Sequence, residues 1–260
     1  MKVAYAGIDL LAPALETLIA QGCEIMQVFT CKTDNITEFN FRVRALAARH
    51  GIPCTDERIR RADLERLRAE GCELFLCGGY YHLIPIVGGL PMVNIHPAYL
   101  PEGRGAWPMP VAIARGLKQS GVTLHKMDAA FDTGDILLQR AFPLLPDENL
   151  QTFMEKLRGF LPELVTELIS DLPGVMARAV PQGAGSYWAC PTEKDWTVTS
   201  EMTAAQADLI LRAFYGYECV YLHGNEKYEM IRGCVTDRKT PYPVKDGYLR
   251  AEKIRKLTDA

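Results

Sequence analysis

The sequence predicts an α/β protein, in which a mainly parallel sheet flanked by helices is followed by a smaller β-rich domain. Two observations predict this class. Short apolar runs alternate with amphipathic stretches over about the first two hundred residues, a pattern typical of repeated βαβ units. Beyond that point, one helical stretch is followed by β-rich stretches that suit a partial barrel. The 260 residues, 48% of them apolar, suffice for a sizeable core.

The first part of the chain is expected to alternate strands and helices in order. The predicted strands are Lys2–Ala6, Glu24–Thr30, Leu74–Cys77, Met92–Ile95, Gly121–Met127 and Ile136–Phe142. The predicted helices are Pro13–Gln21, Phe41–His50, Arg61–Glu70, Pro108–Gly116 and Leu150–Ile169. Helical spacing of Leu15, Leu18 and Ile19 supports the first helix, while Gly71 marks the end of the third.

A change of pattern predicts the domain boundaries. Small residues at 181–186 interrupt both periodicities, so we expect residues 1–180 to form one domain, 181–195 a linker and 196–260 a second domain. The second domain is expected to contain a helix and three strands, at Thr203–Phe214, Glu218–His223, Lys227–Val235 and Tyr248–Ile254. A turn at 224–226 would join the first two strands.

Composition excludes several classes of function. A net charge of −3 gives no general attraction to nucleic acid or acidic membranes. No apolar run approaches the ~20 residues of a membrane span, so we expect a cytoplasmic protein. The eight cysteines include no C-x-x-C pair, so we expect no metal site. The turn after the first strand carries Gly7 where a dinucleotide fingerprint needs three glycines, and a Walker motif is absent.

The first candidate for chemistry follows the strand that ends near residue 95. Asn94 and His96 are two residues apart, so in an extended chain their side chains project from the same face. Parallel α/β sheets bind ligands beyond the carboxyl ends of their strands. Prolines and glycines between Pro97 and Pro108 then impose an irregular loop. We therefore expect an amide and an imidazole to face one ligand site.

The second candidate is the turn-rich stretch from Asp128 to Asp135, which lies between two predicted strands. A carboxylate from Asp132 could orient the His96 imidazole and raise its proton affinity. With Asn94 donating a hydrogen bond, the three groups would suit attack of a neutral amine on a carbonyl carbon. Each residue has an ordinary alternative, since an aspartate before Thr133-Gly134 is usually a turn residue and a histidine at a strand end is usually structural.

Taken together, these motifs resemble the folate-dependent formyltransferase family. The resemblance rests on Asn94-x-His96-Pro97-x3-Pro101, Arg104-Gly105 and Asp132-Thr133-Gly134-Asp135, in this order and at this separation. The loop Tyr80–Pro85 is similar to the sugar-modifying branch, and Asp195-Trp196 is similar to the start of the C-terminal domain in the methionyl-tRNA and sugar branches. This resemblance implies a Rossmann-like catalytic domain and an OB-like C-terminal domain.

The resemblance also implies a mechanism. A primary amine would attack the formyl group of 10-formyltetrahydrofolate directly, with Asn94 steadying the formyl oxygen, His96 shuttling the amine proton and Asp132 orienting His96. The implied pterin contacts come from two loops and are His82, Leu83, Ile84, Asp128, Phe131 and Asp132.

The acceptor is left open between several classes. A nucleotide-linked amino sugar fits the overall acidity and the 80–85 loop best. Methionyl-tRNA is disfavoured because residues 31–37 are short and nearly neutral, although residues 226–256 hold nine basic residues against five acidic ones. Glu102 stands where relatives often carry a basic residue. An amino-acid-derived amine, a folate-binding protein without transfer activity, and a homodimer also remain open.

Overall fold

Apolar strands of five or six residues build the centre of the molecule, because side chains buried on both faces need near-continuous hydrophobic runs. The computed structural model describes residues 1–34 and 38–257; residues 35–37 of the segment expected to be short and neutral lie outside it. The described residues form two compact units. Unit 1 holds Met1–Gly105, Gly121–Ala141 and Lys156–Tyr187, and unit 2 holds Ala106–Ser120, Phe142–Glu155 and Trp188–Ala260.

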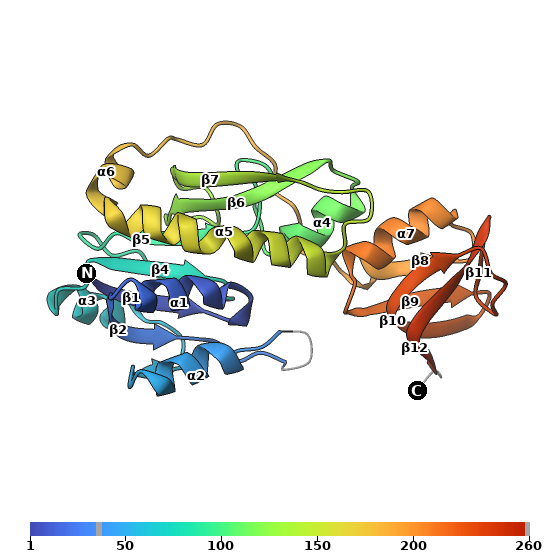
Figure 1. Cartoon of the computed structure of the whole chain (residues 1–260), viewed down its shortest axis with the longest axis horizontal. Coiled ribbons are helices and arrows are strands. Elements are labelled where there is room, and N and C mark those ends of the chain that lie inside the picture. The colour runs from blue at the N-terminus through green and yellow to red at the C-terminus, as the bar shows by residue number, and fades with distance from the viewer. Residues whose placement is uncertain (35–37, 258–260) are drawn as a thin grey trace. The chain divides into compact units, whose positions relative to one another are not determined.

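The larger sheet has seven strands in the order β3-β2-β1-β4-β5-β6-β7 (Figure 1). Its strands are β1 (Lys2–Gly7), β2 (Glu24–Phe29), β3 (Cys54–Thr55), β4 (Leu74–Gly78), β5 (Met92–His96), β6 (Gln119–Lys126) and β7 (Ile136–Pro143). Strands β3, β2, β1, β4 and β5 run parallel, whereas β6 pairs with β5 in the antiparallel sense. The prediction of a mainly parallel sheet is therefore confirmed.

Helices follow the strands in the expected alternation. They are α1 (Ala12–Ala20), α2 (Phe41–Arg49), α3 (Arg61–Ala69), α4 (Pro108–Ala114), α5 (Leu150–Ser170) and α6 (Leu172–Ala177), with a 3-10 turn at Asp9–Leu11. Helix α1 buries Leu15 and Leu18, as its spacing predicted. The Nε of Arg158 in α5 donates to the carbonyl of Leu10, in the 3-10 turn before α1, at 2.9 Å. Helices α1 and α5 lie on the same side of the sheet (Figure 1).

Three short strands and one short α-helix escaped the sequence analysis, among them the two-residue strand at Pro243–Val244. Strand β3 has two residues, helix α6 has six, and β8 (Thr197–Thr199) has three. Elements of this length span less than two periods of hydrophobic spacing. The pattern that predicts longer helices and strands is therefore not expressed in them.

Unit 2 contains the smaller, five-stranded sheet, in the order β11-β12-β10-β9-β8. The remaining elements of the chain are α7 (Ala204–Ala213), β9 (Glu218–His223), β10 (Glu226–Thr236), β11 (Pro243–Val244) and β12 (Gly247–Leu257), with a second 3-10 turn at Glu193–Trp196. Glu226 pairs with His223, so Gly224 and Asn225 alone form the turn of the β9–β10 hairpin. The positive φ of Gly224, 56°, is the conformation that favours glycine at this position.

No helix within residues 1–34 and 38–257 is both long and apolar enough to cross a bilayer. In that part of the chain, no three His, Cys, Asp or Glu side chains are grouped as a metal site would require. All eight cysteines are free thiols.

Candidate active site

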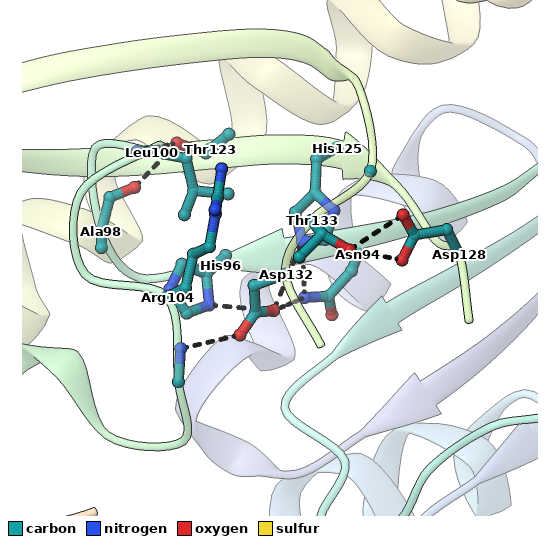
Figure 2. A network of polar contacts seen from close by, with 12 residues as sticks. Asn94, His96, Ala98, Leu100, Arg104, Thr123, His125, Asp128, Asp132 and Thr133 are labelled. Atoms are coloured by element: carbon teal, nitrogen blue, oxygen red, sulfur yellow. Dashed lines mark hydrogen bonds and ion pairs between the residues drawn. The ribbon is translucent and has the colours of Figure 1, made fainter. Parts of the chain in front are cut away.

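The candidate site begins at the last residues of β5, at the boundary between the parallel part of the sheet and β6. Asn94 and His96 lie on one face of β5 because their positions differ by two. The antiparallel register places His125 of β6 opposite Asn94 and Thr123 opposite His96. Four polar side chains from two neighbouring strands are thus brought to one face (Figure 2).

Asp132 approaches these residues from the loop between β6 and β7. Its Oδ1 accepts a hydrogen bond from Nδ2 of Asn94 at 3.3 Å, and its Oδ2 accepts one from the backbone N–H of Gly105 at 3.0 Å. The same Oδ1 lies 3.4 Å from Nδ1 of His96 and 3.5 Å from Nε2 of His125. Asp132 therefore contacts both Asn94 and His96, the two residues that the sequence analysis singled out with it (Figure 2).

The backbone at Asp132 is unusual. Its φ of +58° lies in the left-handed region, which non-glycine residues rarely adopt and which aspartate tolerates better than most. Two residues further on, Gly134 has no room for a side chain, because a Cβ there would lie 1.9 Å from the carbonyl oxygen of Lys126. Such strained positions persist only where the surrounding structure holds them, and they gather at functional sites.

Two further contacts fix the protonation pattern of the histidines. Nε2 of His96 lies 2.8 Å from the carbonyl oxygen of Gly103, and Nδ1 of His125 lies 2.7 Å from the carbonyl oxygen of Lys126. A carbonyl only accepts, so these two ring nitrogens carry hydrogen. In the neutral form of each ring, the unprotonated nitrogen then faces Oδ1 of Asp132. Oδ1 of Asp132 thus faces two unprotonated ring nitrogens, and a proton added to the His96 ring there would lie between that nitrogen and the carboxylate.

Burial and charge shift the pKa values in this cluster. Burial lowers the pKa of His96 below its ordinary 6.5, against the opposing effects of Asp132 and the Gly103 carbonyl. For Asp132, burial alone would raise the pKa, but the proximity of His125 and His96 and the N–H of Gly105 hold it below 3.8. At neutral pH the site therefore contains a carboxylate next to an uncharged imidazole.

Solvent reaches the members of the cluster unequally. The side chains of His96 and His125 are 4% and 3% exposed, whereas that of Asp132 is 10% exposed and Asn94 is partly accessible. A molecule arriving from solvent would therefore meet Asn94 and Asp132 first, with His96 behind them.

Cys77, the partner of Asn94 on β4, is no ready nucleophile, since burial and then the Asp132 charge raise its pKa to about 12.

The residues expected to contact a pterin occupy different environments. His82 and Leu83 are exposed, and Phe131 is 52% exposed, so its ring is not packed inside its own loop. Ile84, in contrast, is buried in the apolar cluster of unit 1. The exposed Asp128 closes its own turn by accepting from the backbone N–H of Ala130 at 3.0 Å and from the hydroxyl of Thr133 at 2.8 Å.

Sequence reasoning missed two members of the cluster, His125 and the N–H of Gly105. The spacing of Thr123 and His125, two residues apart on a predicted strand, is the same signal that singled out Asn94 and His96. That spacing alone does not predict that the two pairs of residues meet, because the register between β5 and β6 decides which side chains lie opposite each other. Thr123 fastens the loop after β5, because its hydroxyl donates to the carbonyl of Ala98 at 2.7 Å and accepts from the N–H of Leu100 (Figure 2).

An α/β sheet that gathers an amide, two imidazoles and a carboxylate at a strand end defines a class of protein with a cluster able to exchange protons. The family follows from comparison with known proteins. Residues 21–169, more than half of the chain, match the formyl transferase family model. The chain belongs to the formyl transferase family, and the resemblance identified from the motifs is confirmed.

One curated relative is the methionyl-tRNA formyltransferase of Aromatoleum aromaticum (strain DSM 19018 / LMG 30748 / EbN1). It is 31% identical over 196 residues, which are 71% of this chain and 62% of that protein. The chain thus matches less than two thirds of that relative's length.

Two solved structures show the same fold. The N-formyltransferase from Helicobacter canadensis, in complex with folinic acid and dTDP-3-aminofucose, superimposes with a TM-score of 0.70 at 16% identity and covers 98% of this chain and 99% of that one. HypX from Aquifex aeolicus, in complex with tetrahydrofolic acid, gives a TM-score of 0.75 at 15% identity, covering 99% of this chain and 44% of that one. Both comparisons confirm the expected fold class.

Proposed function

We propose that this chain transfers the formyl group of 10-formyltetrahydrofolate to a primary amine of a small acceptor, with a nucleotide-linked amino sugar as the acceptor. The observation that carries the proposal is the convergence of Asn94, His96 and Asp132 at one strand end. Family membership supports the donor, and folate compounds are bound in two structures of the same fold.

In the proposed reaction the amine nitrogen bonds to the formyl carbon, and the bond from that carbon to N10 of the folate breaks. Asn94 would donate to the formyl oxygen as it gains negative charge, which requires Nδ2 to exchange one of its two present acceptors, Asp132 and His125. The attacking amine loses a proton, and N10 gains one when tetrahydrofolate leaves.

The exposure of the two side chains indicates which of them would take up this proton first. Asp132 is more accessible than His96, so the proton would meet the carboxylate first and be held between Asp132 and the His96 imidazole behind it. An uncharged imidazole with a depressed pKa is able to accept that proton at neutral pH and release it readily. Because Cys77 stays protonated, the proposal needs no covalent intermediate.

The donor would lie against the exposed parts of two loops. Leu83 and Phe131 present apolar surface that is 47% and 52% exposed, and His82 is exposed beside the ring of Tyr80. Apolar surface with a few polar groups suits a flat ring that has hydrogen-bonding edges. The side chains of Asp128 and Ile84 are engaged elsewhere, with Thr133 and with the apolar cluster of unit 1. These two residues would therefore hold the loops in place and would not offer side-chain surface to the donor.

The acceptor proposal rests on charge. Of the nine basic residues in 226–256, four form ion pairs within unit 2, namely Lys227–Glu193, Arg232–Glu252, Arg255–Glu229 and Lys256–Glu226. Pairing of this kind leaves less free positive charge for the phosphate contacts that dominate binding of nucleic acid. The exposed Glu102, beside the loop that reaches Asp132, adds negative charge near the site.

A methionyl-tRNA acceptor is the second candidate, because the curated relative described above is a methionyl-tRNA formyltransferase. The two acceptors predict different behaviour toward salt. Binding of tRNA would weaken steeply as salt rises, because the release of counterions from the phosphates gains less entropy in a more concentrated salt solution. Binding of a nucleotide sugar, which carries few charges, would change far less.

Incubation of the purified chain with 10-formyltetrahydrofolate and a panel of nucleotide-linked amino sugars tests the proposal, with formylated product detected by mass spectrometry. Asn94→Ala, His96→Ala and Asp132→Ala are assayed singly at saturating donor. Donor binding without consumption for any acceptor would favour a folate-binding role, and formylation of charged initiator tRNA alone would establish the second candidate. Near-wild-type turnover by His96→Ala would remove the proton shuttle.

A further inference from the structure

Residues 180–187, here called the strap, lie against both loops that build the candidate site. At one end, Val180 exchanges two backbone hydrogen bonds of 2.8 Å with Ile136, directly after the Asp132 loop. At the other end, the N–H of Arg104 donates to the carbonyl of Ser186 at 3.0 Å. A Cβ at Gly185 would lie 2.2 Å from the carbonyl oxygen of Pro101, so the backbones approach as closely as only glycine permits.

Among the described residues of the strap, Gln182 is the side chain that hydrogen-bonds to both loops. Its Nε2 donates to the carbonyl of Asp132 at 2.9 Å and to the carbonyl of Gly134 at 2.7 Å. Its Oε1 accepts from Nε of Arg104 at 3.0 Å. Both hydrogens and the oxygen of this amide are thus engaged.

These contacts close a ring around the carboxylate. From the backbone of Asp132 the ring passes through the Gln182 amide to Arg104, continues to the adjacent Gly105, and returns through the Gly105 N–H to Oδ2 of Asp132. A second contact from Arg104, between Nη2 and the carbonyl of Gly183 at 3.1 Å, anchors the strap beside the amide. The ring fixes the distance between the two loops at the point where Asp132 meets the residues of β5.

We propose that Gln182 is a positioning residue for Asp132, holding the left-handed turn in which this carboxylate faces His96, His125 and Asn94. Its hydrogen bonds go to the carbonyls of Asp132 and Gly134 and to Arg104, so it acts through the Asp132 loop backbone and the Arg104–Gly105 segment. The proposal accounts for the persistence of a strained φ at Asp132, because hydrogen bonds from outside the loop hold the turn at Asp132 and at Gly134.

The direct test is titration of the His96 ring. The chain has five histidines, so selective ¹³Cε1 labelling gives few signals, and the His96 signal is identified by its loss in His96→Gln. Gln182→Met keeps the side-chain length and removes all three hydrogen bonds, and Gln182→Ala is the second variant should the first fail to fold. Gln151→Met, at an exposed glutamine on α5 that bonds Glu155, is the matched control.

In the Gln182 variants we expect the His96 titration to move to lower pH, because a displaced Asp132 no longer opposes the effect of burial. The control is expected to titrate like the wild type. A lower melting temperature with an unchanged His96 titration would reduce Gln182 to a structural tether and overturn the proposal, as would a shift to higher pH.

This titration needs neither donor nor acceptor, so its result stands even if formyl transfer is not found. The kinetic part rests on the proposed function. With an acceptor found in the panel, kcat of Gln182→Met is expected to fall roughly 10- to 100-fold, because a misplacement of the order of 1 Å can cost that much. Affinity for folinic acid is expected to fall by less than kcat, because Asp132 is one of several implied donor contacts, and an equal loss in both quantities would contradict a role confined to Asp132.

Discussion

Oδ1 of Asp132 lies 3.4 Å from Nδ1 of His96, although the two residues are 36 positions apart and the second is almost wholly buried. The contact joins the loop after β6 to the end of β5. It places a carboxylate with a lowered pKa beside an imidazole with a lowered pKa, so each residue sets the conditions under which the other binds a proton.

Replacing Asp132 by Asn tests the charge without changing the shape. The amide keeps an oxygen that can accept from Gly105, but it removes the charge that opposes the effect of burial on His96. We expect turnover to fall at least about 100-fold, the lower range for loss of acid–base assistance. Steady-state kinetics with an acceptor from the panel measures this, and full turnover in Asp132→Asn would show that the carboxylate is dispensable.

Stability should depend on pH through His96. Its pKa is lowered in the folded state, so below 6.5 the unfolded chain takes up a proton that the folded chain resists. The folded state is therefore expected to lose stability as pH falls from 7.5 to 5.5. The loss from this residue is about 1.4 kcal/mol at most, since one pH unit below the ordinary pKa is worth that much.

His96→Gln isolates this contribution, because the glutamine keeps a donor toward Gly103 and the other four histidines are unchanged. Urea unfolding at both pH values gives the comparison. The free energy of unfolding of the variant is expected to fall less between pH 7.5 and 5.5 than that of the wild type. Equal losses in the two proteins would mean that His96 does not resist protonation in the folded state.

Gly134→Ala is expected to damage both stability and the site. The added Cβ would meet the carbonyl oxygen of Lys126 at 1.9 Å, so the backbone of the Asp132 loop must move. Overpacking of this kind costs about 1–3 kcal/mol. Gly159→Ala in α5 is the matched control, since nothing lies within 4 Å of that Cβ and alanine favours a helix. Chemical denaturation checks both, and a Gly134→Ala protein as stable as Gly159→Ala would contradict the close approach.

Phe131→Ala tests the proposed donor surface. The ring is 52% exposed, so its removal disturbs little of the folded chain, while loss of apolar contact with a pterin should weaken binding of folinic acid about five- to tenfold. Leu145→Ala, at an apolar residue of unit 2 that is 51% exposed, serves as the control. Calorimetric titration with folinic acid gives both constants, and equal affinities in the two variants would place the donor elsewhere.

The sequence was sufficient wherever the signal is local. Runs of apolar residues predicted the long strands and helices, and spacing by two predicted that Asn94 and His96 share a face, because strand geometry alternates side chains regardless of neighbours. It also gave Asp132 as a turn residue with a carboxylate. Its motifs pointed to the formyl transferase family, which the comparisons confirmed.

Only the tertiary structure decided how these pieces meet. His125 joins the cluster because β6 pairs antiparallel with β5 in a register that sets it against Asn94. Gln182 reaches Asp132 across 50 residues from a segment whose small residues predicted a linker. Register and loop closure depend on contacts between distant parts of the chain, which no short window of sequence contains. The sequence therefore determined which chemical groups the site contains, while the packing of the sheet and its loops decided that these groups lie together.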